Sequence, residues 1–389
     1  MKAELQVSNF GSNPGGLRMH TYVPEGMPPR APLVVAMHGC SQNATAYANA
    51  GWNDLADKWK FYVVYPESTS FGSCFKWFDA LHTRRGSGEA ASINQMVDWM
   101  KSNHDVDPER VFVTGLSAGG GMTSVMLAAY PDVFAAGAIM AGLPYRCADS
   151  QATAGSCMSG KDLSADAWGD LVRNAYSGHK GPYPRVSIWH GTTDFVVNKK
   201  NMDELVEQWT NVHGLATTAS STGVVGKASH AEFKSAAGEP LVESWTITGM
   251  GHGTPVDPGF DPAGGCGTAG AFILDVGICS SYHAGLFFGL DPSNPNPGPG
   301  PSDGGTDPEG DPDGGSGSDA GVDPQPWTCR EVLATNQDHF QARRATRCGS
   351  DCLDACAVGS KEFLGLRTAP GELWLREVSA GYFETGRCR

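Results

Sequence analysis

Residues 115–119 have the pattern G-x-S-x-G and lie between two segments of opposite character. The apolar run 111–114 before them is typical of a buried strand, and residues 122–129 after them have a helical pattern. A serine on a sharp turn from a strand into a helix needs glycines on both sides, because the turn brings the backbone segments close together. This context favours a nucleophile elbow at Ser117 over an ordinary glycine-rich turn.

Strand-like apolar runs alternate with helical patterns along the first 290 residues. The clearest strand-like runs are residues 32–37, 61–65, 111–114, 136–141, 186–189 and 243–248. Residues 93–100 and 202–209 instead place apolar side chains three and four positions apart, as an amphipathic helix requires. Such alternation predicts an α/β fold with a mostly parallel sheet and helices on both faces.

A serine hydroxyl is a poor nucleophile unless a histidine accepts its proton and an acid orients that histidine. With this kind of elbow the three residues follow in the order Ser, Asp or Glu, His. Asp194 comes just after a strand-like run, in a turn rich in glycine and threonine. His252 follows another such run and has glycines on both sides. The sequence therefore predicts a triad of Ser117, Asp194 and His252.

Four other histidines after Ser117 have positions that suit a base less well. His190 adjoins the Asp194 turn and His283 lies in an apolar segment, so both are interpreted as structural residues. His213 lies at a helix end and His230 in a polar loop.

Two backbone N–H groups must also point at the oxyanion that forms during ester cleavage. One is expected from Ala118, the residue after the nucleophile, and the other from Cys40 in the loop after the strand 32–37. A disulfide between Cys40 and Cys74 is a hypothesis at this point, since it would hold the loop and its donor in place.

The chain of 389 residues is long enough for one large domain and a smaller one. Residues 291–326 contain 18 Pro and Gly and eight acidic side chains, without Lys or Arg. Such a composition buries too little apolar surface to fold, which predicts a disordered linker. We therefore expect a catalytic domain at 1–290 and a small cysteine-rich module at 327–389.

The formal net charge of −14 argues against nucleic-acid binding, which requires clustered Lys and Arg. No apolar stretch in the sequence approaches the length of a membrane span. The predicted chemistry needs neither a cofactor nor a metal. The oligomeric state does not follow from the sequence.

Eleven cysteines favour an oxidising compartment, and hence a secreted protein. The first residues show no apolar signal segment. Either a signal was removed or the start is misplaced, or the protein stays inside the cell with free thiols.

Several motifs together resemble a known family. They are residues 38–42 (H-G-C-S-Q), 74–78 (C-F-K-W-F), 83–89 (T-R-R-G-S-G-E), 115–120 (G-L-S-A-G-G), 187–194 (S-I-W-H-G-T-x-D), 249–258 and 266–283. The chain resembles the secreted polyhydroxyalkanoate depolymerases with a mid-domain lipase box, and the related feruloyl and acetylxylan esterases of carbohydrate esterase family 1. The resemblance covers about residues 8–290 and implies the α/β-hydrolase fold and the same triad. It also implies two disulfides, Cys147–Cys157 and Cys266–Cys279.

The last sixty residues resemble a small cysteine-bounded module found in some secreted enzymes. A bridge between Cys329 and Cys388 would staple a unit too small for a secure core. Three further cysteines recur every four residues and would share one face of a helix, where with His339 they could bind zinc. These are Cys348, Cys352 and Cys356. Disulfides are the favoured alternative, and five cysteines leave one unpaired.

The expected function is that of a serine carboxylesterase acting on an insoluble aliphatic polyester, such as a short-chain poly(3-hydroxyalkanoate). One alternative is the same catalyst on feruloyl or acetyl esters of xylan, a polysaccharide substrate. Another is a surface-binding protein with an inactive hydrolase domain. Trp77 and Trp189 are candidate substrate-binding residues, although aromatic side chains beside strands also pack cores.

Overall fold

The computed structural model describes residues 5–259 and 265–293, together with six strands between residues 330 and 385. The chain divides into two compact units, Met1–Thr306 and Asp307–Arg389. Most of the expected linker, residues 294–326, lies outside the described residues.

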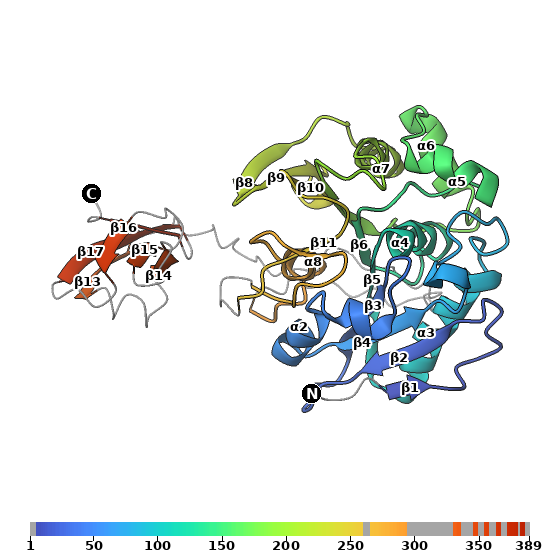
Figure 1. Ribbon diagram of the computed structural model, residues 1–389, viewed down its shortest axis with the longest axis horizontal. Coiled ribbons are helices and arrows are strands. Elements are labelled where there is room, and N and C mark those ends of the chain that lie inside the picture. The colour runs from blue at the N-terminus through green and yellow to red at the C-terminus, as the bar shows by residue number, and fades with distance from the viewer. Residues whose placement is uncertain are drawn as a thin grey trace, which may run out of the picture. The chain divides into compact units, whose positions relative to one another are not determined.

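The first unit is built on a ten-stranded sheet with the order β1-β2-β4-β3-β5-β6-β7-β10-β9-β8 (Figure 1). Its six central strands are parallel to one another. They are β4 (Tyr62–Glu67), β3 (Ala31–Met37), β5 (Val106–Leu116), β6 (Ala136–Met140), β7 (Arg185–Gly191) and β10 (Pro240–Ile247). Strands covered on both faces are apolar along their whole length, and all seven residues of β3 are buried.

Antiparallel strands complete the sheet at both edges. One edge is formed by β1 (Leu5–Val7) and β2 (Arg18–Tyr22), the other by β9 (Ala228–Lys234) and β8 (Ser221–Val225). A separate pair consists of β11 (Thr254–Val256) and β12 (Ile273–Asp275).

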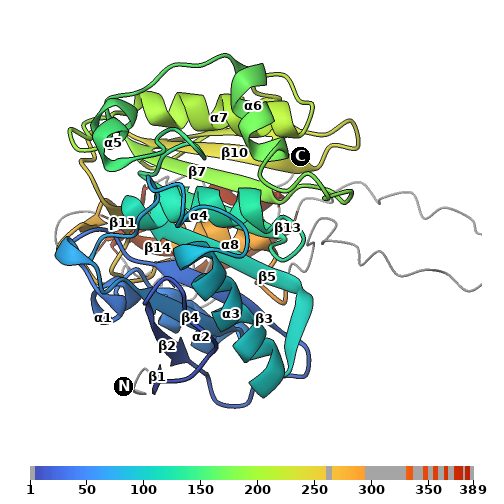
Figure 2. The same ribbon diagram turned by 90° about the vertical axis from the view of Figure 1, so that its right-hand side faces the viewer.

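Helices cover both faces of the sheet (Figure 2). One face packs against α3 (Gly88–Asn103), α4 (Ala118–Ala129), α6 (Ala165–Arg173) and α7 (Lys200–Val212). The other packs against α1 (Ala44–Ala48), α2 (Trp52–Trp59) and α8 (Ser280–Phe288). Two short helices, η1 (Phe71–Ser73) and α5 (Gln151–Met158), lie in loops that follow strands. Each face therefore has its own apolar core.

The predicted fold class is confirmed, and each of the six expected runs is a parallel strand at the centre of the sheet. The placement of His230 in a polar loop is wrong, because His230 lies in β9 opposite Trp245 of β10. Most β9 side chains are only partly buried, so the sequence carries little apolar alternation there. Pairing with β10 makes this segment a strand.

The second unit contains two small antiparallel sheets. One is formed by β13 (Arg330–Thr335), β17 (Glu372–Ser379) and β18 (Tyr382–Thr385), the other by β14 (Ala345–Cys348), β15 (Asp354–Ala357) and β16 (Phe363–Leu366). Cys348 and Cys356 lie in neighbouring strands, so a helix that carries the three cysteines on one face is wrong. Cys329, His339, Cys352 and Cys388 lie outside the described residues.

None of the helices in the described part of the chain is long and apolar enough to cross a lipid bilayer.

Candidate active site

Ser117 occupies a sharp turn between β5 and α4. Its backbone has φ of 56° and ψ of −114°, in a region that residues other than glycine rarely adopt. The Ser117 N–H donates to the Met140 carbonyl at 2.9 Å, and its carbonyl accepts from the Gly121 N–H at 2.8 Å. The surrounding backbone therefore holds the strained residue in place, as is common at functional sites.

Gly115 and Gly119, on either side of Ser117, lie so close to other backbone atoms that a side chain would not fit. A Cβ at Gly115 would lie 2.5 Å from the Gly119 carbonyl carbon and oxygen. A Cβ at Gly119 would lie 2.3 Å from the carbonyl oxygen of Met37, at the end of β3. Neither position has room for a methyl group, which explains the G-x-S-x-G pattern in physical terms.

Asp194 and His252 form a hydrogen-bonded pair. The distance between Asp194 Oδ2 and His252 Nδ1 is 2.7 Å. The other carboxylate oxygen of Asp194 accepts from the N–H groups of Val196 and Val197, each at 2.9 Å. An ionised acid at this position keeps the proton on Nδ1 and leaves Nε2 free to accept one.

The environment of Asp194 favours its ionised form. Burial acts to raise the pKa of the carboxyl, but hydrogen bonds from His190 and His252 outweigh it and hold the pKa well below its ordinary value. His190 is fully buried, with Nε2 2.9 Å from the Val197 carbonyl oxygen and 3.4 Å from Asp194 Oδ2. It lies beside the acid, in contact with the loop that carries it.

Ser117, Asp194 and His252 all follow the carboxyl ends of parallel strands, namely β5, β7 and β10. The carboxyl ends of parallel strands meet at one edge of the sheet, where open α/β sheets bind their ligands. The loops after β7 and β10 touch, since a Cβ at Gly191 would lie 2.2 Å from the Met250 carbonyl oxygen. The three predicted triad residues thus come from the same edge.

The loop after β3 brings Cys40 to this edge as well. The structure contains the Cys40–Cys74 disulfide, and the Ser41 N–H donates to the Gly72 carbonyl at 2.8 Å. Within the described residues, neither the N–H of Cys40 nor that of Ala118 donates a hydrogen bond. Both residues line the same cavity as Ser117.

The cavity has a volume of about 370 Å³, within the range of sites for small molecules. Trp77 and Phe78 form part of its apolar lining, with ring centroids 5.4 Å apart in an edge-to-face arrangement. The rest of the apolar lining comes from segments that the sequence did not single out. These residues are Phe71, Leu143, Ala154, Met158 and Val197.

Trp189 is not among the residues that line this cavity. Side chains alternate along a strand, so Ile188 of β7 faces the α4 side of the sheet and Trp189 the α8 side. There Trp189 stacks on Trp245 with centroids 4.6 Å apart, and its indole N–H donates to Ser187 Oγ at 2.7 Å. The structure gives Trp189 the core position that the sequence left open as the alternative to substrate binding.

The other two disulfides implied by the family resemblance, Cys147–Cys157 and Cys266–Cys279, are also present.

In the described residues there is no cluster of three or more His, Cys, Asp or Glu that could hold a metal ion. His283 packs in α8 against Trp245, and burial lowers its pKa to about 4.

The chain is also similar to known proteins. The family model described as "Esterase PHB depolymerase" matches residues 17–230. The Poly(3-hydroxyalkanoate) depolymerase C of Paucimonas lemoignei is 58% identical over 292 residues, which are 74% of this chain and 70% of the relative. An acetylxylan esterase of Coprinopsis cinerea is 40% identical over 259 residues, 64% of this chain and 69% of the relative.

Among solved structures, the acetyl xylan esterase from Aspergillus awamori matches with a TM-score of 0.64 and 27% sequence identity. The match covers 74% of this chain and 99% of that one. The fold, the strained serine turn and these relatives lead to one conclusion: the chain belongs to the esterase PHB depolymerase family and is a serine esterase with the α/β-hydrolase fold.

Proposed function

We propose that this chain hydrolyses the ester bonds of a short-chain poly(3-hydroxyalkanoate), with Ser117, His252 and Asp194 as its catalytic triad. The observation that carries the proposal is the Asp194–His252 hydrogen bond of 2.7 Å, at the sheet edge where Ser117 opens into an apolar cavity. The relative with 58% identity, named a poly(3-hydroxyalkanoate) depolymerase, supports this choice of substrate.

The proposed reaction has two stages. His252 Nε2 takes the proton of Ser117 Oγ while that oxygen attacks the ester carbonyl carbon, and the N–H groups of Cys40 and Ala118 hold the oxyanion. The C–O bond to the alcohol half then breaks, and His252 returns the proton to the leaving alkoxide. Water, activated by the same imidazole, then releases the acyl group from Ser117 as a carboxylic acid.

The lining of the cavity fits an aliphatic chain. Apart from the catalytic groups and Gln151, it presents aliphatic, aromatic and sulfur-containing side chains. Such a surface gains free energy by removing apolar area of the substrate from water.

We also propose that the protein acts outside the cell on insoluble polymer. The three disulfides among the described residues support an oxidising compartment. A solid polymer granule outside the cell can be reached only by an enzyme that is also outside.

Hydrolysis of feruloyl or acetyl esters on xylan is the second candidate. Trp77 and Phe78 favour it, since aromatic side chains in a cavity can pack against a ferulate ring or a sugar. The acetylxylan esterase relative at 40% identity points the same way.

The deciding experiment compares acid released from poly(3-hydroxybutyrate) granules with ferulate and acetate released from xylan. We expect release from the granules to exceed the other two, and Ser117→Ala to abolish it while circular dichroism stays unchanged. Preferential release of ferulate or acetate would favour the second candidate. Retained activity in Ser117→Ala would show that another residue is the nucleophile.

The third possibility, a surface-binding protein, concerns the C-terminal unit. If that unit docks the enzyme on polymer, a chain that ends at residue 306 should cleave soluble p-nitrophenyl butyrate as the full chain does. It should adsorb to granules less and degrade them more slowly. A full chain that adsorbs but cleaves no ester would instead support an inactive hydrolase domain.

A further inference from the structure

We propose that α5 is the wall of the cavity that selects the length of the acyl chain, and that the Cys147–Cys157 disulfide sets the position of this wall. The proposal rests on the proposed function in one respect, namely that the cavity beside Ser117 receives the ester. It concerns residues that take no part in the chemical steps described above.

One face of α5 lines the cavity. Its contributing residues are Gln151, Ala154 and Met158, spaced three and four positions apart. Side chains at this spacing lie one above another on a single helix face. Ala152 is exposed and does not line the cavity, so the same helix also has a surface position that the substrate does not reach.

Little apolar burial holds α5 in place. Cys157 is the only buried residue among its eight. A helix of this length is marginal in water by itself, and most helices in proteins are stabilised by packing of an apolar face. The position of α5 therefore depends on the packing of Ala154, Cys157 and Met158 against the core and on a few specific links.

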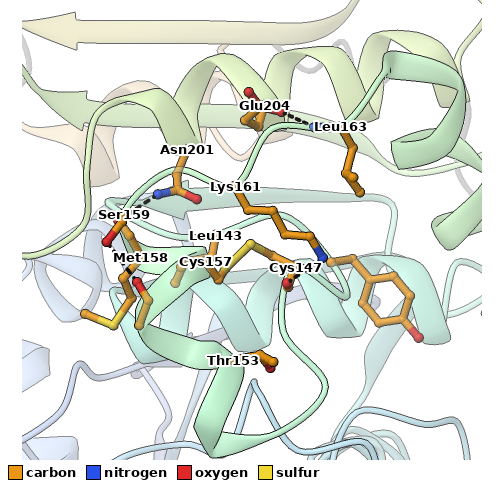
Figure 3. The surroundings of a disulfide bond; sticks show 12 residues. Leu143, Cys147, Thr153, Cys157, Met158, Ser159, Lys161, Leu163, Asn201 and Glu204 are labelled. Atoms are coloured by element: carbon orange, nitrogen blue, oxygen red, sulfur yellow. Dashed lines mark hydrogen bonds between the residues drawn. A yellow bond between two sulfur atoms is a disulfide. The ribbon is translucent and has the colours of Figure 1, made fainter.

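The disulfide is the strongest of these links. It joins Cys157, near the end of α5, to Cys147, which lies in the loop that follows β6 (Figure 3). Cys147 is itself buried, and Lys161 Nζ donates to its carbonyl oxygen at 3.2 Å. The same loop contains Leu143, another residue of the cavity lining. The bond thus joins α5 to a buried residue of the loop that follows β6.

The residue after Cys157 connects this wall to the loop of the acid. The Met158 carbonyl accepts from the Asn198 N–H at 2.8 Å. It also accepts from Asn201 Nδ2 at 3.1 Å (Figure 3). Asn198 directly follows Val197, whose N–H donates to Asp194. A shift of α5 would therefore move the cavity wall directly, and would move the loop of Asp194 through the two hydrogen bonds at the Met158 carbonyl.

Ala154 has the shortest side chain of the three that line the cavity from α5. Its methyl group leaves room that a longer acyl chain can occupy. A phenyl ring at this position would fill part of a space of about 370 Å³ and would exclude long chains before short ones. The predicted effect is a change in selectivity and not in the chemistry itself.

The first test compares Ala154→Phe with Ala152→Phe, which makes the same change on the exposed side of the same helix. Full-length variants are assayed on p-nitrophenyl acetate, butyrate and octanoate. We expect Ala154→Phe to lower the octanoate to acetate ratio of kcat/KM by about tenfold or more, a typical value for a pocket contact of a few methylene groups. Ala152→Phe should keep the wild-type ratio. Equal ratios in the two variants would overturn the assignment of α5 as the selecting wall.

The second test removes the disulfide with Cys147→Ser/Cys157→Ser. We expect KM for the octanoate to rise at least threefold and the preference among chain lengths to flatten, while kcat for the acetate stays within threefold. Cys266→Ser/Cys279→Ser is the comparison variant, because it removes a disulfide with a similar sequence separation, 13 against 10, on the α8 side of the sheet. Its loop contains Phe272, whose ring centroid lies 6.1 Å from that of His252, so we expect any loss of kcat there to be the same for all three esters and the chain-length preference to stay unchanged. Wild-type selectivity in the first variant, or equal loss in both, would overturn the positioning role.

A thermal unfolding curve for each variant shows whether it is folded at the assay temperature. If Cys147→Ser/Cys157→Ser does not fold, Ala154→Phe still tests the wall. The soluble esters also separate this inference from the proposed function. If the wild-type chain cleaves the soluble esters but releases nothing from polymer granules, the proposed polyester substrate is contradicted. The chain-length ratio measured on the soluble esters does not depend on that result.

Discussion

The turn that carries Ser117 and the helix α5 lie on the same cavity, yet they are held in place by different means. All twelve residues of α4, which follows Ser117, are buried, whereas α5 buries only Cys157. A Cβ at Gly115 or Gly119 would clash with backbone atoms, whereas a Cβ at Gly155 of α5 would have no atom within 4 Å. Ser117 is held by close packing, whereas α5 depends more on the Cys147–Cys157 disulfide and on hydrogen bonds at Met158.

This difference separates the part of the site that makes the reaction possible from the part that chooses its substrate. Close packing tolerates few changes, because protein interiors are as dense as crystals of small molecules. An exposed helix held by one disulfide can change its side chains at little cost in stability. Relatives that act on different esters could therefore share the turn and differ at the wall.

Among variants that keep Ser117, the largest effect is expected from Asp194→Asn, in the loop that follows β7. The amide oxygen can still accept from the N–H groups of Val196 and Val197, so the loop should keep its shape. The NH₂ group would face His252 Nδ1 and favour the tautomer with its proton on Nε2, which cannot act as a base. We expect kcat for p-nitrophenyl butyrate to fall by about 10⁴-fold.

Asp203→Asn is the matched control, because Asp203 is an exposed residue of α7 that pairs with Lys199. It should leave kcat unchanged. An Asp194→Asn variant with more than a tenth of the wild-type kcat would show that another acid orients the base.

The pH dependence of the free energy of unfolding reports on the core and not on the side chains of α5. The reason is that α5 contains no Asp, Glu, His, Lys or Arg. Burial lowers the pKa of His283 to about 4 from an ordinary value of 6.5. Its stabilising contribution is therefore fully present above pH 6.5 and is lost as the pH falls towards 4. With about 1.4 kcal/mol for each pKa unit, the loss at this residue is up to about 3 kcal/mol.

Urea unfolding at pH 7.5 and pH 4.5 measures this loss. We expect His283→Gln to reduce the difference between the two values of the free energy of unfolding. His179→Gln, in the loop after α6, is the control and should retain the wild-type difference. An unchanged pH dependence in His283→Gln would exclude His283 as the source.

The smallest effects come from one pair of substitutions, Gly119→Ala and Gly155→Ala. Alanine is favoured over glycine in a helix by about 1 kcal/mol. At Gly119 the clash with the Met37 carbonyl oxygen at 2.3 Å should outweigh this gain and destabilise the protein by about 1–3 kcal/mol. At Gly155 the space is open, so we expect a gain of about 0.5–1 kcal/mol.

Urea unfolding midpoints measure both changes, and p-nitrophenyl butyrate activity shows whether the serine turn survives. Activity should fall in Gly119→Ala and stay unchanged in Gly155→Ala. Equal stability changes at the two glycines would contradict the contrast between the turn and α5.

Much of the fold could be predicted because its central strands are buried on both faces. Such strands read as continuous apolar runs, and β3, β5 and β7 were each recognised from such a run. The strands at the sheet edges, such as β9, are polar and partly exposed, so their sequence resembles a loop. They form strands because a neighbouring strand supplies hydrogen bonds.

The sequence by itself determined the strained turn at Ser117 and the glycines that this turn requires, because short-range sterics govern these features. Only the tertiary structure decided that Trp189 faces the α8 core and that α5 lines the cavity. When a strand is buried on both faces, apolar residues point to both of them, so its sequence does not show which face of the sheet each side chain lies on. Which loop closes over a site depends on contacts between residues far apart in the chain, such as Met158 and Asn198, and local sequence does not encode such contacts.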